Sequence, residues 1–157
     1  MHGAQEKLDH FWDGKLPVNV ESIAKSFGMR IYTDDTISDC AIVSLETDVI
    51  VARIKSSFPP SQRRYIVAHQ FGHYVLGHID NPERCRRETL SNFKADVPLL
   101  IERVANEFAS SLLMPEKTLN YAISHKGYSN IGGLAKLFGV SDRAVHQRLK
   151  VLKILPR

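Results

Sequence analysis

A pair of prolines divides this sequence into two parts with different patterns. Pro59 and Pro60 have no amide hydrogen to donate, so a strand must end before them and a helix can follow them. Before the prolines, short runs rich in Ile, Val and Tyr are separated by turn-like residues. These runs, Met29–Thr33, Cys40–Leu45 and Val49–Lys55, predict a small antiparallel sheet.

After the prolines, apolar residues recur at helical spacing. They predict helices over Gln62–Gly77, Pro98–Leu113, Glu116–Ser124, Ile131–Phe138 and Ser141–Leu155, with Ser61 as the cap of the first. One further amphipathic helix is expected before the strands, over Pro17–Gly28. The polar, aperiodic segment His78–Asp96 is predicted to be a mobile loop. The expected fold class is therefore α+β, mostly helical with a small antiparallel sheet.

Length and composition are those of one ordinary globular domain. The chain has 157 residues, of which 43% are hydrophobic and 24% charged, so we expect a single domain over residues 1–157 with its own core. No apolar run approaches the ~18 residues that cross a bilayer, and the first residues lack the apolar stretch of a secretory signal. We therefore expect a soluble cytoplasmic protein without a membrane partner.

Two histidines on the first helix after the prolines are the clearest chemical signal. His69 and His73 stand four positions apart, so both imidazoles project from one helix face and can reach the same cation. This is the spacing of the H-E-x-x-H zinc motif, in which the glutamate is the general base. Gln70 stands at the position of that glutamate here. The competing interpretation is that the two histidines are only neighbours on a polar face.

The next long helix offers a third metal ligand. Glu102 shares a stripe at spacings of three and four with Ala105, Asn106, Ala109 and Leu113, which predicts a buried helix face. A carboxylate on such a face needs a cation, and zinc held by the two histidines would provide it. A salt bridge from Glu102 to a nearby arginine is the alternative.

The two motifs together resemble the ImmA/IrrE family of zinc metallopeptidases. The first is His69-Gln70-Phe71-Gly72-His73, and the second runs from Glu102-Arg103-Val104-Ala105-Asn106 to Met114-Pro115. The resemblance implies a zincin-like fold in which His69, His73 and Glu102 bind Zn²⁺ and Gln70 replaces the catalytic glutamate. It also implies a protein substrate, namely a helix-turn-helix repressor or antitoxin whose cleavage switches on genes of a mobile element or a stress response.

Gln70 changes what such a site can do. Its amide has nearly the shape of a glutamate side chain and can form hydrogen bonds, but it cannot accept and return a proton. We therefore expect zinc binding to survive while turnover falls by at least the ~10²- to 10⁴-fold that general acid–base catalysis contributes. Two explanations stay open: a deliberate inactivating substitution, or the natural residue of a protein that binds without cutting.

The C-terminal segment 129–157 has the rhythm of a helix-turn-helix and carries the net basic charge of the chain. It holds six basic residues and one acidic residue, and a DNA-binding regulator would use Arg143 and Arg148 on the second helix. The alternative is that Val140, Val145 and Leu149 make these helices part of the peptidase core. A third possibility is a toxin–antitoxin component acting by protein contact. The oligomeric state is not predicted.

Overall fold

The prolines separate strand from helix as predicted. The computed structural model describes residues 6, 9–80, 86–94 and 96–154. Strand β3 (Val49–Ile54) ends before the prolines, and helix α3 (Pro60–Val75) begins at the second of them. Pro59 occupies the N-cap position and no side chain caps this helix, so the prediction of a Ser61 cap is wrong. Proline tolerates this position because the amide hydrogens of the first turn have no partner within a helix.

The other helices lie close to their predicted places. They are α2 (Val20–Ser26), α4 (Leu100–Leu113), α5 (Glu116–His125), α6 (Ile131–Phe138) and α7 (Asp142–Leu152). Asn19 caps α2 by accepting a hydrogen bond from the Ser22 amide, and this shortens the helix predicted over Pro17–Gly28 at its start. Among the described residues, none of the helices has the length and apolarity needed to cross a membrane.

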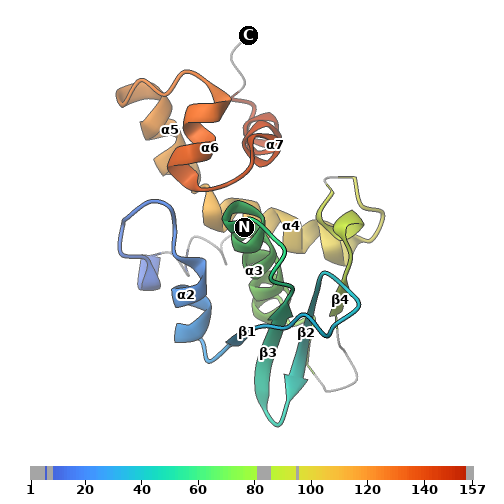
Figure 1. The fold of residues 1–157 in the computed structure, drawn as a ribbon. Coiled ribbons are helices and arrows are strands. Elements are labelled where there is room, and N and C mark those ends of the chain that lie inside the picture. Colours follow the sequence, from blue (N-terminus) through green and yellow to red (C-terminus); the bar gives the residue numbers. More distant parts are fainter. Residues whose placement is uncertain (1–5, 7–8, 81–85, 95, 155–157) are drawn as a thin grey trace.

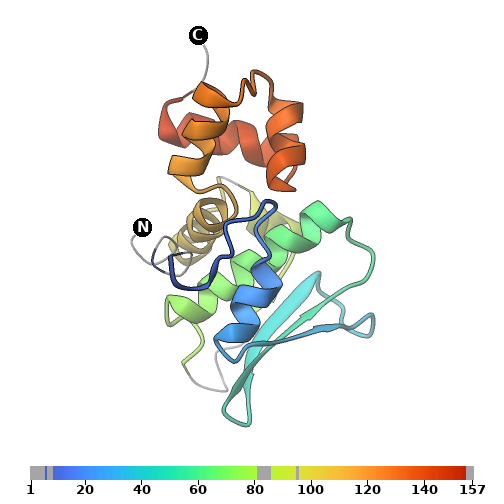
Figure 2. The same cartoon turned by 90° about the vertical axis from the view of Figure 1, so that its left-hand side faces the viewer.

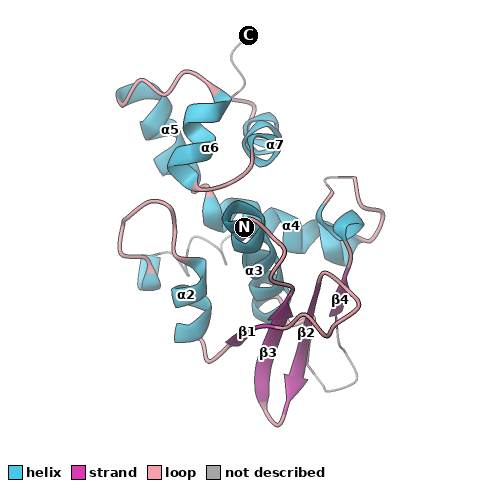
Figure 3. Cartoon of the chain, viewed as in Figure 1, coloured by secondary structure: helices cyan, strands magenta, loops and turns pink. Residues whose placement is uncertain are grey.

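The sheet is mixed rather than antiparallel, which corrects the prediction. Its strands β1 (Arg30–Thr33), β2 (Ala41–Glu46), β3 and β4 (Arg86–Glu88) lie in the order β1-β3-β2-β4 (Figure 3). Strands β2 and β3 form a hairpin whose turn residues Thr47 and Asp48 have φ of 46° and 63°. The tight turn makes β2 and β3 neighbours, and β1 pairs in parallel with the other edge of β3. The alternation of apolar and polar residues along a strand does not distinguish parallel from antiparallel pairing.

The segment His78–Asp96 is not wholly a loop, which corrects a second prediction. It contains β4 and the short 3₁₀ helix η1 (Leu90–Phe93), while residues 81–85 and 95 lie outside the described residues. Strand β4 pairs antiparallel with β2, so that Glu88 stands opposite Ala41. Its sequence Arg-Arg-Glu has no apolar residue, so the hydrophobic pattern that usually predicts a strand is missing.

Helices α3 and α4 occupy the middle of the molecule. Figures 1 and 2 show the sheet and α2 at one end, helices α5 to α7 at the other, and the α3–α4 pair between them. Gly72 on α3 permits the close contact within this pair, because a Cβ atom there would lie 3.0 Å from Phe108 Cδ1 and 3.3 Å from the Ala105 carbonyl oxygen. Gly72 therefore has a packing role, and the contact brings His69 and His73 next to α4.

The last two helices form the predicted pair with a sharp turn. Gly139 ends α6 in the left-handed conformation with φ of 63°, and the Ser141 side chain caps α7 by accepting a hydrogen bond from the Ala144 amide. Arg64 on α3 donates to the Gly139 carbonyl oxygen at 2.6 Å. Val145 and Leu149 are buried, so α7 packs into the core as one of the two interpretations predicts.

Candidate metal centre

The structure brings together the three predicted ligands. Their side chains are fully buried. The Nε2 atoms of His69 and His73 lie 3.0 Å apart. Glu102 Oε2 lies 3.1 Å from His69 Nε2 and 3.2 Å from His73 Nε2. A four-residue step on α3 and the close approach of α4 thus place three potential ligand atoms around one point, as the helical spacing predicts.

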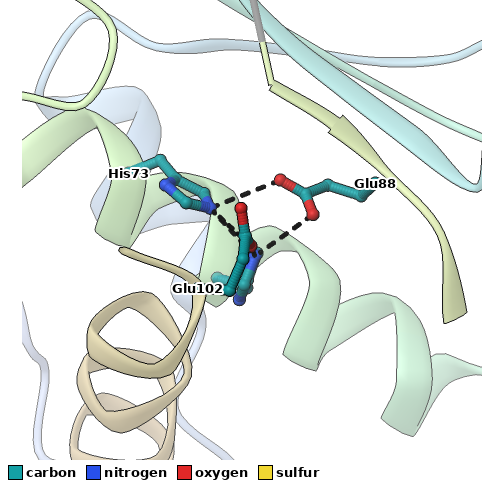
Figure 4. A group of neighbouring side chains, drawn as sticks. His73, Glu88 and Glu102 are labelled. Carbon is teal, nitrogen blue, oxygen red and sulfur yellow. Dashed lines mark hydrogen bonds and ion pairs between the residues drawn. The ribbon is translucent and has the colours of Figure 1, made fainter. Parts of the chain in front are cut away.

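A fourth side chain, Glu88 on β4, joins this group and was missed by the sequence analysis. Glu88 is also fully buried. Its Oε2 lies 3.5 Å from His69 Nε2 and its Oε1 lies 3.3 Å from His73 Nε2 (Figure 4). The potential ligand atoms of the four residues all lie within 4.8 Å of one another. The only sequence signal was the presence of a glutamate in a segment with no helical period.

The donor set and its spacing fit a zinc ion. Ligand atoms at 2.0 to 2.2 Å from a tetrahedral zinc lie roughly 3.3 to 3.6 Å from one another. The distances around the two Nε2 atoms run from 3.0 Å between the imidazoles to 3.5 Å between His69 and Glu88. Two imidazoles and two carboxylates are also a chemically ordinary zinc donor set. The distances from the two imidazoles to their neighbours are therefore close to those of a zinc site, and the four potential ligand atoms all lie within 4.8 Å of one another.

Each imidazole has a hydrogen-bond partner on its other nitrogen. His69 Nδ1 lies 2.8 Å from Asn106 Oδ1, and His73 Nδ1 lies 2.8 Å from His78 Nδ1. An Nδ1–H group on each of His69 and His73 would donate to these acceptors, which leaves both Nε2 lone pairs free for a metal. The arrangement of these outer partners thus favours the tautomer that zinc binding requires.

Helix η1 holds Asn106 in place from the opposite side. Asn106 Nδ2 donates to the carbonyl oxygens of Asn92 at 2.8 Å and Lys94 at 3.3 Å. The Phe93 ring packs edge-on against the His69 ring, with centroids 4.9 Å apart. Because these contacts cover the His69 side of the centre, the segment predicted to be a loop takes part in building the site.

The two carboxylate oxygens of Glu102 face different partners, and the predicted arginine salt bridge is present. While Oε2 faces the histidines, Oε1 accepts a hydrogen bond from Arg86 Nη2 of β4. The arginine salt bridge is therefore compatible with metal binding, because each uses a different carboxylate oxygen. Arg86 also connects β4 to α4 across the centre.

The two carboxylates are held in their charged form. Burial alone would raise the pKa of Glu102 and of Glu88, but hydrogen bonding to His69 and His73 outweighs it and leaves both pKa values below the ordinary range. Burial acts against the protonated form of His69, yet its pKa is raised because the two glutamates stabilise the positive charge. The two charged carboxylates thus favour a positive charge at the centre, either a proton on His69 or a metal ion.

Gln70 is a fully buried polar residue of α3. Within the described part of the chain, neither its Oε1 nor its Nε2 has a hydrogen-bond partner. An amide buried in this way costs about 1 to 3 kcal/mol for each unsatisfied group. A bound water or another polar group at this position would remove the cost.

The two predicted DNA-binding arginines occupy different environments. Arg143 is exposed on α7. Arg148 is buried, and its Nε donates to the Met114 carbonyl oxygen at 3.2 Å. Both line a groove of about 420 Å³ between α3, α4, η1 and α7. In this arrangement Arg148 stabilises the junction between α7 and the end of α4 instead of presenting its charge on the exposed face of the helix.

Comparisons with known proteins agree with this architecture. The family described as the IrrE N-terminal-like domain, a group of M78 peptidases, matches residues 24–150. No curated protein sequence matches the chain. The fold is similar to that of a Mycobacterium tuberculosis transcriptional regulator, with a TM-score of 0.64 and 23% identity over 99% of this chain and 47% of that one. This chain therefore spans about half the length of that regulator.

Proposed function

We propose that this chain, which belongs to the IrrE N-terminal-like family of M78 metallopeptidases, is a zinc-dependent peptidase domain whose turnover is limited by Gln70. The match over residues 24–150 confirms the family that the two sequence motifs predict. The observation that carries the proposal is the convergence of His69, His73 and Glu102 on one buried point.

The proposed zinc ligands are His69 Nε2, His73 Nε2 and one oxygen of Glu102. Zinc held by three protein ligands lowers the pKa of a bound water and polarises a substrate carbonyl. The residues of the chain orient the ligands: Asn106 and His78 face the Nδ1 atoms of the histidines, and Arg86 holds the second oxygen of Glu102. Zinc binding therefore does not depend on the residue at position 70.

Gln70 limits the reaction at its proton-transfer step. A glutamate at this position would take a proton from the attacking water and return one to the leaving amine. The glutamine amide can position a water or a peptide group through hydrogen bonds, and its Oε1 and Nε2 atoms have no partner among the described residues. It cannot accept a proton, so the site is expected to bind peptide but to cut it slowly.

The proposed substrate is a protein, specifically a helix-turn-helix repressor or an antitoxin encoded near this gene. The resemblance of the two motifs to the ImmA/IrrE family supports this choice. Cleavage would remove the repressor and switch on genes of a mobile element or a stress response. Because the side chains of the centre are fully buried, access for a protein chain would require a neighbouring segment such as β4 to move, which would restrict cutting to a partner that binds well.

The test compares this chain with a Gln70→Glu variant. Zinc content is measured by elemental analysis after dialysis, and cleavage is followed by mass spectrometry with the repressors encoded beside the gene as substrates. Both proteins should contain one zinc per chain. The variant should cut one repressor at least ~10²-fold faster than the unchanged chain does, because ~10²-fold is the lower end of the contribution of general acid–base catalysis.

Two results would count against the proposal. A Gln70→Glu variant that holds zinc but cuts no neighbouring repressor would favour a protein that binds without cutting. Absence of zinc from both proteins would favour a metal-free interaction module. The variant Gln62→Glu makes the same chemical change at an exposed position of the same helix, so it controls for the added charge.

A further inference from the structure

We propose that Glu88 is a fourth protein ligand of the metal, so that four side chains close the resting site. This inference rests on the metal binding proposed above and extends it to a residue outside both motifs. Catalytic zinc sites keep three protein ligands and leave one position for water, whereas structural sites use four. The identity of the fourth ligand therefore decides whether the resting site is open or closed.

The position of the Glu88 carboxylate supports this role. One oxygen lies 3.3 Å from His73 Nε2 and the other 3.5 Å from His69 Nε2, so the group faces the same two nitrogens as Glu102 does (Figure 4). Glu88 approaches from the sheet, and Glu102 approaches from α4. Carboxylates that face one pair of imidazoles from two different elements surround a common point.

Among the described residues, no arginine pairs with Glu88. Arg86 pairs with Glu102, and Arg87 on the outer face of β4 pairs with Asp39 at 3.1 Å. Apart from the two imidazoles, neither oxygen of Glu88 has a hydrogen-bond partner among the described residues. A fully buried carboxylate is stable only with a compensating cation. A divalent metal shared with the histidines supplies that charge.

The backbone of β4 fixes this carboxylate at the centre. The Glu88 carbonyl oxygen accepts a hydrogen bond from the Cys40 amide at 2.8 Å, and β4 pairs with β2 over Ala41 to Val43. Because side chains alternate along a strand, Arg86 and Glu88 face the centre while Arg87 faces solvent. Both inward residues of β4 therefore reach the site: Arg86 contacts Glu102, and Glu88 faces the two imidazoles directly.

A closed site and a missing base oppose hydrolysis independently. Gln70 removes the proton acceptor, whereas Glu88 occupies the coordination position that catalytic zinc leaves for water. A substrate that displaces β4 would remove Glu88 and open that position. Movement of β4 would thus change both the access of a substrate to the site and the number of protein ligands on the metal.

The experiment uses the full chain loaded with Co²⁺, whose visible spectrum reports the ligands of the metal, and azide as the probe. The chain itself should bind one Co²⁺ and show no spectral change with azide. In Glu88→Ala azide should bind and shift the spectrum. Zinc affinity, measured by competition with a chelator, should fall at least tenfold, since loss of outer-shell partners alone costs about 10- to 100-fold.

Two further variants make the result decisive. Arg87→Ala changes the outer face of the same strand and should behave as the unchanged chain. Glu88→Gln keeps the shape of the side chain and should also admit azide, which covers the case in which Glu88→Ala fails to fold. An azide shift in the unchanged chain, with zinc affinity equal to that of Glu88→Ala, would overturn the inference. Absence of metal from every protein would instead overturn the metal site itself.

Discussion

His73 and His78 face each other through their Nδ1 atoms at 2.8 Å, although His73 lies on α3 and His78 follows its end. Only one hydrogen fits between two such nitrogens. If His73 donates it, His73 Nε2 is free for a metal and His78 must stay neutral to accept. Burial and the neighbouring His73 and Arg86 lower the pKa of His78 to about 4, so this neutral form is the stable one near pH 7.

Removal of this acceptor should weaken zinc binding. His78→Ala is expected to lower zinc affinity by about 10- to 100-fold, because an outer-shell partner fixes both the tautomer and the orientation of its ligand. His78→Asn, whose amide oxygen can replace the Nδ1 acceptor, should retain most of the affinity. Chelator competition at pH 7 measures both variants. Equal affinity for the alanine and asparagine variants would show that the His73–His78 contact does not orient the ligand.

The same contact predicts how acid affects the metal-free protein. The pKa of His78 is about 4 in the folded chain and ~6.5 in the unfolded one, so between these values the unfolded state binds the additional proton. The contribution of His78 to stability is therefore complete above pH 6.5 and is lost as the pH falls toward 4. The raised pKa of His69 acts in the opposite direction, because its protonated form is favoured by folding.

Urea unfolding in the presence of a chelator, at pH 7.0, 5.5 and 4.5, isolates this effect when His78→Asn is compared with the unchanged chain. The unchanged chain should lose more stability on acidification, since the asparagine cannot take up a proton. His69 is present in both proteins and cancels in the comparison. Parallel losses in the two proteins would contradict the lowered pKa of His78.

Helical spacing predicted three of the four buried side chains of the centre, but it could not predict Glu88. His69, His73 and Glu102 lie on regular helices, where a period of 3.6 residues determines which side chains share a face. Glu88 lies on a strand of three charged or polar residues that forms by pairing its backbone with β2. Such pairing is a long-range contact, and neither local propensity nor local hydrophobicity encodes it.

The sheet shows the same limit. The hairpin from β2 to β3 followed from short β-rich runs around a turn, but the parallel pairing of β1 with β3 depends on how α2 and α3 pack on the sheet. The stripe on α4 was more informative. It predicted a buried face with Glu102, Ala105 and Asn106, and these residues are buried.

The contact between α3 and α4 should be sensitive to a single methyl group. In Gly72→Ala the new Cβ would lie 3.0 Å from Phe108 Cδ1 and 3.3 Å from the Ala105 carbonyl oxygen, so α4 must shift. We expect a loss of about 1 to 3 kcal/mol in the free energy of unfolding, as is usual for overpacked cores. Zinc affinity should also fall, because Glu102 lies on α4.

Gly132→Ala is the matched control for this substitution. Its Cβ would lie 3.6 Å from Asn130 Oδ1, which is ordinary contact, and alanine favours a helix over glycine by up to about 1 kcal/mol. The control should therefore be as stable as the unchanged chain or slightly more stable. Chemical denaturation of the metal-free proteins measures both. A Gly72→Ala variant as stable as the control would show that the α3–α4 contact tolerates a wider separation.

Metal removal should destabilise the chain through its two buried carboxylates. Without a cation, Glu88 and Glu102 face the same imidazoles as like charges inside the protein, and a bound metal converts this repulsion into attraction. Zinc at a free concentration of 1,000 times its Kd should stabilise the folded state by about 4 kcal/mol. The melting temperature should therefore rise with zinc and return when a chelator is added.

In Glu102→Gln, removal of the metal should lower the free energy of unfolding by less than it does in the unchanged chain. The rise in melting temperature with zinc should also be smaller, since the variant lacks one negative charge and one strong ligand. A rise of equal size in both proteins would place the zinc outside this centre.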